Sequence, residues 1–201
     1  MKPITVSLAH DVSLQPSGAL IDRFMPTADI SESHEIVIEA PAASVFEVAE
    51  NLDLQSIPIV YAIFWVRAKL FRVKVPERQG AKGLVAETLA LGWGVLAYRP
   101  GRELVMGAVT QPWVGDVKFR AIAPDAFACF AEPDLVKIAW TLEAEPLAAG
   151  KTRFRTLTRV LPMDDGARKK FRRYWFAFGI GIRLIRWFGN RAIRREAERI
   201  G

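Results

Sequence analysis

The longest periodic pattern of apolar and polar residues lies in the last fifth of the chain, over residues 164–200. Apolar side chains recur there at helical spacing on one broad face, and a second face consists of Arg172, Gly179, Arg183, Arg186, Asn190 and Arg194. Asp164 suits an N-cap, and Asp165 follows it at the positive end of the helix dipole. The pattern therefore predicts one long C-terminal helix. Its broad apolar face consists of Phe171, Trp175, Phe178, Ile182, Ile185, Gly189, Ala192, Ile193 and Ile200.

A second, smaller apolar strip lies roughly opposite this face. We call it the outer strip, and it consists of Phe176, Ile180, Leu184 and Trp187. If the broad face packs on a sheet, the outer strip must face outward, which is uncommon for four large apolar side chains in a monomer. We expect an equivalent helix of a homodimer to cover it, because dimers are common. An anionic membrane surface, the N-terminal arm or the apolar residues 59–66 are the alternatives.

The residues before this helix predict a sheet and several shorter helices. Residues 33–39 alternate, with His34, Ile36 and Ile38 on one side, which is typical of a strand with one buried face. Ala40-Pro41 then begins a helix. Proline is favourable in the first turn, because the N–H group that it lacks would have no hydrogen-bond partner within the helix. The predicted order is a strand at 33–39, helices at 40–52 and 58–71, strands from 84 onward, a short helix at 124–131, strands at 136–145 and 152–160, and the long helix.

A tight turn is predicted at residues 99–102, because Pro100 presets one φ angle and Gly101 accepts a positive one. Counting outward from this turn pairs Val95 with Met106 and Trp93 with Ala108. The bulkier apolar side chains of this hairpin then share one face, which we take to be the concave face of the sheet.

Composition indicates an ordinary globular protein. The chain has 201 residues, 51% of them hydrophobic and 25% charged. This is enough for one domain with a sizeable core and short for two domains. We predict an N-terminal arm at residues 1–30 and a single domain at residues 31–201. The start of the chain lacks the pattern of a signal peptide, and no uncharged stretch near the C-terminus approaches about 20 residues. We therefore expect a cytoplasmic protein, peripheral to a membrane at most.

Positive charge is concentrated in the C-terminal helix. Residues 164–201 hold eleven Lys and Arg against four Asp and Glu, while the whole chain has a net charge of +6. Attraction to an anionic surface should therefore be sought on this helix. Nucleic acid is the least expected partner, because a helix buried in its own sheet leaves scattered arginines and no recognisable reading motif.

The chain resembles the START-like, Bet v 1-like superfamily, which includes polyketide cyclases and dehydratases. The resemblance covers about residues 31–200 and is carried by the order of elements, the terminal helix and the opening motif Ile36-Val37-Ile38-Glu39-Ala40-Pro41-Ala42-Ala43-Ser44-Val45-Phe46. It implies an α+β helix-grip fold, in which a curved antiparallel sheet wraps around the long helix. It also implies that a small hydrophobic molecule, such as a lipid or polyketide, binds between them. Members divide between carriers and enzymes and share no catalytic residue to carry over.

Strand parity and helix phase bring ten side chains toward that predicted cavity. They are Trp93, Met106, Trp140, Phe154, Thr156, Thr158, Phe171, Trp175, Phe178 and Ile182. Bulky groups of this kind either fill a core or line a pocket for a ligand. The two threonines either orient oxygen atoms of a ligand or bond to one another.

Candidates for catalysis are few. Glu87 is a weak candidate. A carboxylate on a concave apolar face can act as a general acid or base. The alternative is that Glu87 lies near the end of a strand and contacts water or an arginine. His10, His34 and the single Cys129 form no recognisable metal set, so we predict no metal and no cofactor. Cys129 itself is expected to be a small buried hydrophobe.

The residues and the resemblance together favour non-covalent binding of a small hydrophobic ligand, with transport of that ligand as one form of this function. The alternatives are a cyclase- or dehydratase-like enzyme with an acid or base in the cavity, and a membrane-peripheral or oligomeric interaction module.

Overall fold

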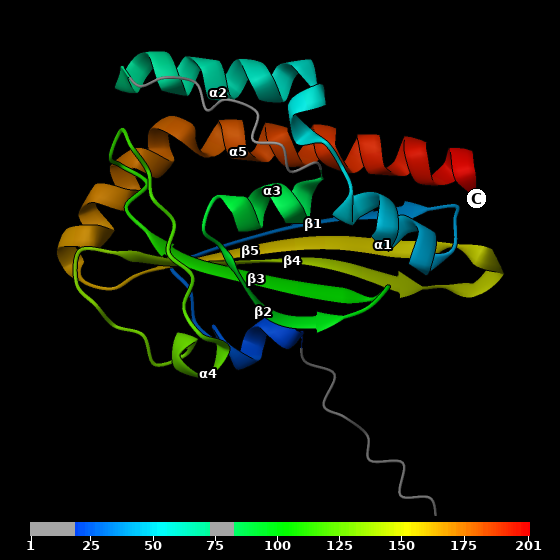
Figure 1. Cartoon of the computed structure of the whole chain (residues 1–201), viewed down its shortest axis with the longest axis horizontal. Helices are drawn as coiled ribbons and strands as arrows, with labels where there is room; N and C mark the ends of the chain where they lie inside the picture. The colour runs from blue at the N-terminus through cyan, green and yellow to red at the C-terminus, as the bar shows by residue number, and fades with distance from the viewer. Residues whose placement is uncertain (1–18, 73–82) are drawn as a thin grey trace, which may run out of the picture.

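The computed structural model describes residues 19–72 and 83–201, and a five-stranded antiparallel sheet forms its centre (Figure 1). The strands follow the order β1-β5-β4-β3-β2 across the sheet. They are β1 (Ile30–Ile38), β2 (Gly94–Arg99), β3 (Glu103–Thr110), β4 (Val136–Pro146) and β5 (Thr152–Pro162). The helices are α1 (Ala42–Glu50), α2 (Pro58–Phe71), α3 (Leu84–Ala90), α4 (Pro124–Phe127) and α5 (Asp165–Ile200), with 3-10 turns η1 (Leu20–Arg23), η2 (Leu54–Ser56) and η3 (Ala148–Gly150).

The long helix begins where the sequence predicts. The Asp164 side chain accepts a hydrogen bond of 2.8 Å from the Ala167 amide, and this N-cap starts the 36 residues of α5. Hydrogen bonds from the amides of Asp134 and Ala167 lower the pKa of the Asp164 carboxyl. At 1.5 Å per residue, α5 is about 54 Å long and spans the whole sheet. The helix-grip architecture predicted from the sequence is confirmed.

The alternating strand predicted at residues 33–39 is confirmed within β1. It pairs along its whole length with β5, from Ile30 opposite Val160 to Ile38 opposite Thr152. The Thr152 hydroxyl also donates a 2.6 Å hydrogen bond to the Ala40 carbonyl, which joins positions 112 residues apart. The first and last strands therefore lie side by side, although β1 is an edge strand.

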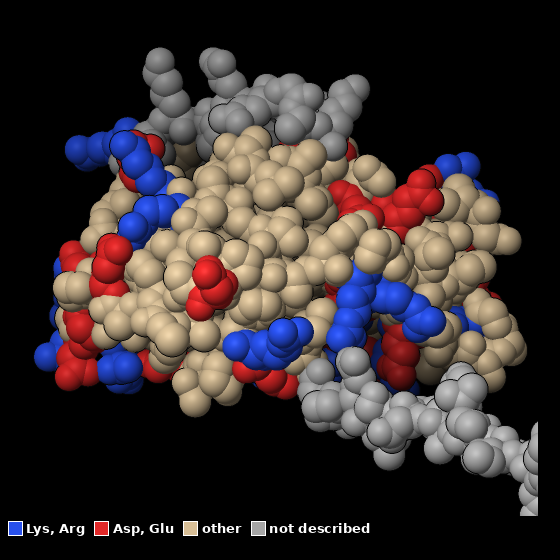
Figure 2. All heavy atoms as spheres, turned by 60° about the horizontal axis from the view of Figure 1, so that its bottom comes forward, with Lys and Arg blue, Asp and Glu red and all other residues tan. Residues whose placement is uncertain are grey.

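Apolar cores lie on both faces of the sheet. On the concave face, α1 and the C-terminal half of α5 pack against β3, β4 and β5; the buried residues include Val45, Phe46, Leu104, Met106, Leu142, Phe154, Ile193 and Ala197. On the other face, η1 and α4 pack against the sheet; the buried residues include Leu20, Ile21, Phe24, Met25, Leu96, Val105, Phe127 and Leu157. The face that carries α4 and η1 shows charges of both signs, mostly toward its edges, with a wide uncharged area between them (Figure 2).

The prediction of a strand from residue 84 onward is wrong, because Leu84–Ala90 form the helix α3 and β2 begins only at Gly94. A short apolar run fits a helix and a strand about equally well by periodicity. Gly83 leads into α3 with a φ of 102°, a backbone conformation that suits glycine. Trp93 lies ahead of β2, so its predicted pairing with Ala108 does not form.

The predicted pairing of Val95 with Met106 is confirmed, but the turn is one residue longer than we counted. Arg99 lies opposite Glu103 rather than Arg102, and a β-bulge between Val95 and Ala97 restores the register. Gly101 takes the positive φ predicted for it, at 67°. Two deviations of one residue thus cancel before the strands reach the core.

Several smaller expectations have plain outcomes. Residues 1–18 of the predicted arm lie outside the described residues, and residues 20–25 pack against the sheet. The expected helix at 124–131 is shorter, as α4 ends at Phe127. Cys129 is exposed rather than buried, because it follows the end of this short helix in a surface loop. None of the helices in the described ranges combines the length and apolar character needed to cross a bilayer.

Candidate ligand-binding cleft

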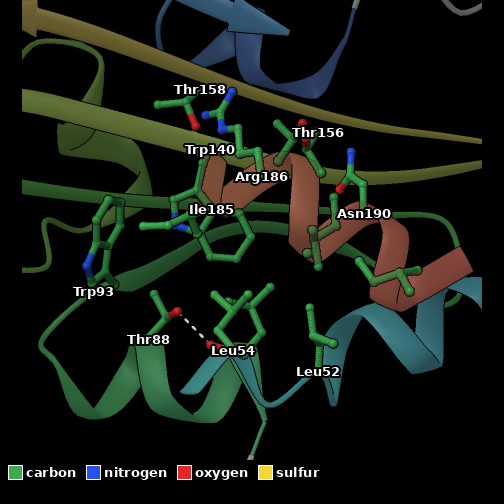
Figure 3. A pocket seen from close by; sticks show the side chains of 15 residues that line it. Leu52, Leu54, Thr88, Trp93, Trp140, Thr156, Thr158, Ile185, Arg186 and Asn190 are labelled. Carbon is green, nitrogen blue, oxygen red and sulfur yellow. Dashed lines mark hydrogen bonds between the residues drawn. The ribbon is translucent and has the colours of Figure 1, made fainter. Parts of the chain in front are cut away.

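A cleft of about 210 Å³ opens between α5, the concave face of the sheet, α3 and the segment around η2 (Figure 3). Its position follows from the antiparallel sheet, whose β4 and β5 form the floor, and from α5, which crosses above them. The lining residues are Leu52, Leu54, Leu84, Thr88, Trp93, Trp140, Thr141, Leu142, Thr156, Thr158, Ile185, Arg186, Gly189, Asn190 and Ile193.

Helical spacing selects the part of α5 that faces the cleft. Ile185, Gly189 and Ile193 recur every four residues, and Arg186 and Asn190 follow the first two on the same side. Gly189 leaves space free between α5 and the segment around η2. A Cβ atom at this position would lie 3.4 Å from the Leu54 Cδ2 atom, so a larger side chain would enter the cleft.

One side of the cleft is apolar. Leu52 and Leu54 lie there with Trp93, opposite the strands (Figure 3). The Trp93 ring meets the Trp140 ring edge-on, with centroids 6.4 Å apart, which fixes one end wall. The Thr88 hydroxyl donates a 2.6 Å hydrogen bond to the Leu84 carbonyl of its own helix, so it is already engaged.

The opposite side is polar. Thr156 and Thr158 share one face of β5, and Arg186 and Asn190 lie beside them on α5 (Figure 3). The Thr156 Oγ1 and Asn190 Nδ2 atoms are buried and have no hydrogen-bond partner among residues 19–72 and 83–201. Burial lowers the pKa of the Arg186 guanidinium, since a charge is costly away from water. The cleft therefore has two chemically distinct sides.

Four of the ten side chains predicted to line a cavity do so, namely Trp93, Trp140, Thr156 and Thr158. The other six lie elsewhere. Met106 and Phe154 are fully buried in the concave core, and Phe171, Trp175, Phe178 and Ile182 belong to the N-terminal half of α5. There Phe171 packs with Val136 and Val160 of the sheet, which leaves the opening further along α5.

The sequence reasoning missed the C-terminal part of the cleft. It placed Arg186 and Asn190 on the polar face of α5, whereas both line the cleft and Asn190 is only 3% exposed. The available signal was the Gly189-Asn190 pair inside a long helix, since glycine in a helix interior indicates a close approach of another segment. Leu52 and Leu54 follow α1 in a connection whose path the sequence does not specify.

Glu87 does not have the setting assumed for it. It lies on α3 instead of a strand, it is partly exposed, and its neighbour Thr88 faces the cleft. Within residues 19–72 and 83–201, no cluster of three His, Cys, Asp or Glu side chains is suited to a metal ion. The cleft thus offers hydrogen-bond donors and one cation, but no acid or base among its lining residues.

Comparisons with solved structures find similarity at low sequence identity. A protein from Chromobacterium violaceum is 10% identical, with a TM-score of 0.36 over 84% of this chain and 97% of that one. The Zhui aromatase/cyclase from Streptomyces sp. R1128 is 14% identical, with a TM-score of 0.29 over 85% and 94%. Ara h 8.0201, a Bet v 1 allergen, is 12% identical, with a TM-score of 0.28 over 84% and 97%.

No family model and no curated protein matches the chain. The architecture of the chain itself is the helix grip that the START-like, Bet v 1-like resemblance implied, so the resemblance holds at the level of the fold.

Proposed function

We propose that this protein binds a small hydrophobic molecule, without forming a covalent bond, in the cleft between the sheet and α5. The observation that carries this proposal is the cleft itself, whose walls are mostly leucine, isoleucine and tryptophan side chains. Ligand sites are typically concave and apolar, with a few polar groups that fix the orientation of the ligand. The polar side around Arg186 matches that description.

The size of the cleft limits the ligand. A volume of about 210 Å³ is below the roughly 300–1,000 Å³ of pockets for drug-sized molecules. The ligand is therefore small, such as a short acyl chain or one or two fused rings. A larger lipid or polyketide would have to leave part of itself outside.

A filling substitution tests the proposal directly. We expect Leu54→Trp to weaken binding of the neutral fluorescent probe N-phenyl-1-naphthylamine by about tenfold or more, because the indole occupies space that the probe needs. Fluorescence titration of the full chain measures the affinity. Leu70→Trp is the matched control, because Leu70 on α2 is exposed and lies away from the cleft.

Equal affinity of the wild-type protein and Leu54→Trp would contradict the proposal, provided that both proteins melt cooperatively. Native mass spectrometry of the purified protein gives an independent measurement. A small apolar molecule that co-purifies with the wild type but is lost in Leu54→Trp would support the cleft as its site.

A further inference from the structure

The polar side of the cleft has donors without acceptors. The Asn190 side chain is 3% exposed, and its Nδ2 atom, which carries two N–H donors, has no partner among the described residues. The buried Thr156 Oγ1 atom has none there either. Buried polar groups in folded proteins are nearly always paired, so two such groups lining one cleft indicate that this side suits a ligand with oxygen atoms.

Arg186 adds a positive charge to the same side. Its Nη1 atom donates a 2.8 Å hydrogen bond to the backbone carbonyl of Glu32, whereas the Glu32 carboxylate pairs with Arg183 at 2.7 Å. In the part of the chain that the structure describes, the Arg186 guanidinium forms no ion pair with a carboxylate. Four of its five N–H donors are therefore left without a protein partner in that part of the chain.

We propose that the ligand is an amphiphilic carboxylic acid, whose carboxylate binds Arg186, Asn190, Thr156 and Thr158 while its apolar body lies against Leu52, Leu54 and Trp93. This inference rests on the proposed function, because it assigns the orientation and the head group of a ligand in the same cleft. A guanidinium presents its donors in a planar fork that matches the two oxygens of a carboxylate.

The charge of the cleft favours a monoanion. Arg186 is the single Lys or Arg among the described lining residues, and none of those residues is acidic. Burial lowers the pKa of Arg186, the nearby Glu32 carboxylate raises it only in part, and an anionic ligand would offset the remaining cost. A phosphate group would bring about −1.5 to −2 charges against one guanidinium, so a carboxylate matches better.

Three probes share an alkyl chain of eight carbon atoms and differ in their head group: octanoate, 1-octanol and octyl phosphate. They distinguish a carboxylate site from a neutral or a phosphate site. We expect the full-length wild-type protein to bind octanoate about tenfold or more tightly than 1-octanol, because charge-assisted hydrogen bonds are the stronger ones. Isothermal titration calorimetry at neutral pH measures all three affinities. Equal binding of octanoate and 1-octanol would overturn this inference and leave the proposed function intact, whereas binding of neither would overturn both.

Tighter binding of octyl phosphate than octanoate would also overturn the assignment of a carboxylate. The variants then locate the head group. We expect Arg186→Met and the nearly isosteric Thr156→Val to lose most of the preference for octanoate while they keep their affinity for 1-octanol. Arg195→Met is the matched control, since Arg195 is exposed on the same helix and does not line the cleft.

A folding defect in Arg186→Met would not obscure the result. The preference of the wild-type protein is measured without any substitution, and Thr156→Val removes one polar atom at almost constant volume. Should both variants retain the wild-type preference for octanoate, the head group must bind elsewhere and the inference fails.

Discussion

Two threonines of β5 occupy similar positions but have opposite hydrogen-bonding states. Thr152 donates to the Ala40 carbonyl, whereas the Oγ1 atom of Thr156 is buried without a partner in the cleft. An unpaired buried hydroxyl costs about 1–3 kcal/mol, and a paired one contributes about 1 kcal/mol. The Thr156 hydroxyl is therefore a destabilising group at the site where we place the head of the ligand.

Substituting valine for each of the two threonines should change the free energy of unfolding in opposite directions. We expect Thr156→Val to raise the free energy of unfolding of the ligand-free protein by about 1 kcal/mol, since it removes an unpaired polar group. Thr152→Val, its matched control, should lower that free energy by about 1–2 kcal/mol. Urea denaturation followed by circular dichroism measures both. A loss of stability in Thr156→Val equal to that in Thr152→Val would show that Thr156 has a partner.

Glu103 gives the protein a pH-dependent contribution to stability. Burial raises the pKa of its carboxyl above the usual 4.5, and the nearby Glu143 carboxylate raises it further, although the Leu20 amide donates a 3.0 Å hydrogen bond to it. The folded state thus holds this proton more tightly than the unfolded chain does. Its contribution is fully present below pH 4.5 and is lost as the pH rises through the folded-state pKa.

The substitution Glu103→Gln keeps the shape and removes the titration. We expect the stability of the wild-type protein relative to this variant to fall as the pH rises from about 4 to 7. Denaturant titrations across this range measure the difference. Glu47→Gln, at an exposed position on α1, serves as the control. A difference that stays constant with pH would contradict the raised pKa.

At the scale of the elements, two glycines have contrasting roles. A Cβ atom on Gly107 of β3 would lie 2.5 Å from Leu96 Cδ1 and 2.7 Å from Phe127 Cε2, inside a packed core. On α5, a Cβ atom on Gly189 would meet only ordinary contacts with Leu54 and Leu52. The first glycine is required by packing, and the second keeps the cleft open.

The same substitution at both positions should therefore act in opposite directions. Gly107→Ala is expected to lower the free energy of unfolding by about 1–3 kcal/mol through overpacking. Gly189→Ala is expected to raise it by up to about 1 kcal/mol, because alanine is the better helix former. Thermal and urea denaturation check both changes. Destabilisation by Gly189→Ala would mean that α5 and η2 already touch more closely than described.

The sequence predicts regular elements well where one face is buried along a long stretch. The period of α5 and the alternation of β1 are both such signals, and both predictions are confirmed. The prediction of a strand at residues 84–90 was wrong, because seven residues are too few to distinguish the periodicity of a helix from that of a strand. The prediction for the hairpin turn was one residue too short, because Arg99 pairs with Glu103 instead of Arg102, and the compensating bulge near Leu96 follows no local pattern in the sequence.

The candidate site was harder to predict than the fold. Parity along β4 and β5 correctly placed Trp140, Thr156 and Thr158 toward the cleft. Arg186 was assigned to the polar face of α5 because hydropathy treats a guanidinium as a surface group. A partly buried charge that faces a cleft, such as Arg186, can be recognised only when the surrounding elements are placed around it.

At the scale of the whole molecule, the outer strip of α5 is exposed among the residues that the structure describes. Phe176 is 90% exposed, Ile180 68%, Leu184 39% and Trp187 42%, and α2 packs beside α5 without covering them. The guanidinium of Arg191 lies 4.3 Å from the centre of the Trp187 ring. A surface of this kind is uncommon in a monomer, so we keep the expectation of a homodimer.

We expect the wild-type protein to sediment as a dimer and Trp187→Glu to shift it toward the monomer, because the substitution places a charge within the apolar strip. Analytical ultracentrifugation measures the shift. Arg195→Gln changes the net charge by the same amount at an exposed site and should have little effect. A wild-type monomer that binds anionic vesicles at low salt would favour the membrane instead, and a monomer without such binding would contradict both.

The pairing of β1 with β5 also has a consequence for synthesis on the ribosome. The partner of the first strand emerges more than a hundred residues later, as the Thr152–Ala40 bond across 112 positions shows. At about 5–20 residues per second, β1 waits on the order of 10 s with its apolar face unpaired. Because α5 follows β5, the concave core can assemble only when the final fifth of the chain has left the exit tunnel. A nascent chain stalled before residue 152 should therefore depend on chaperones.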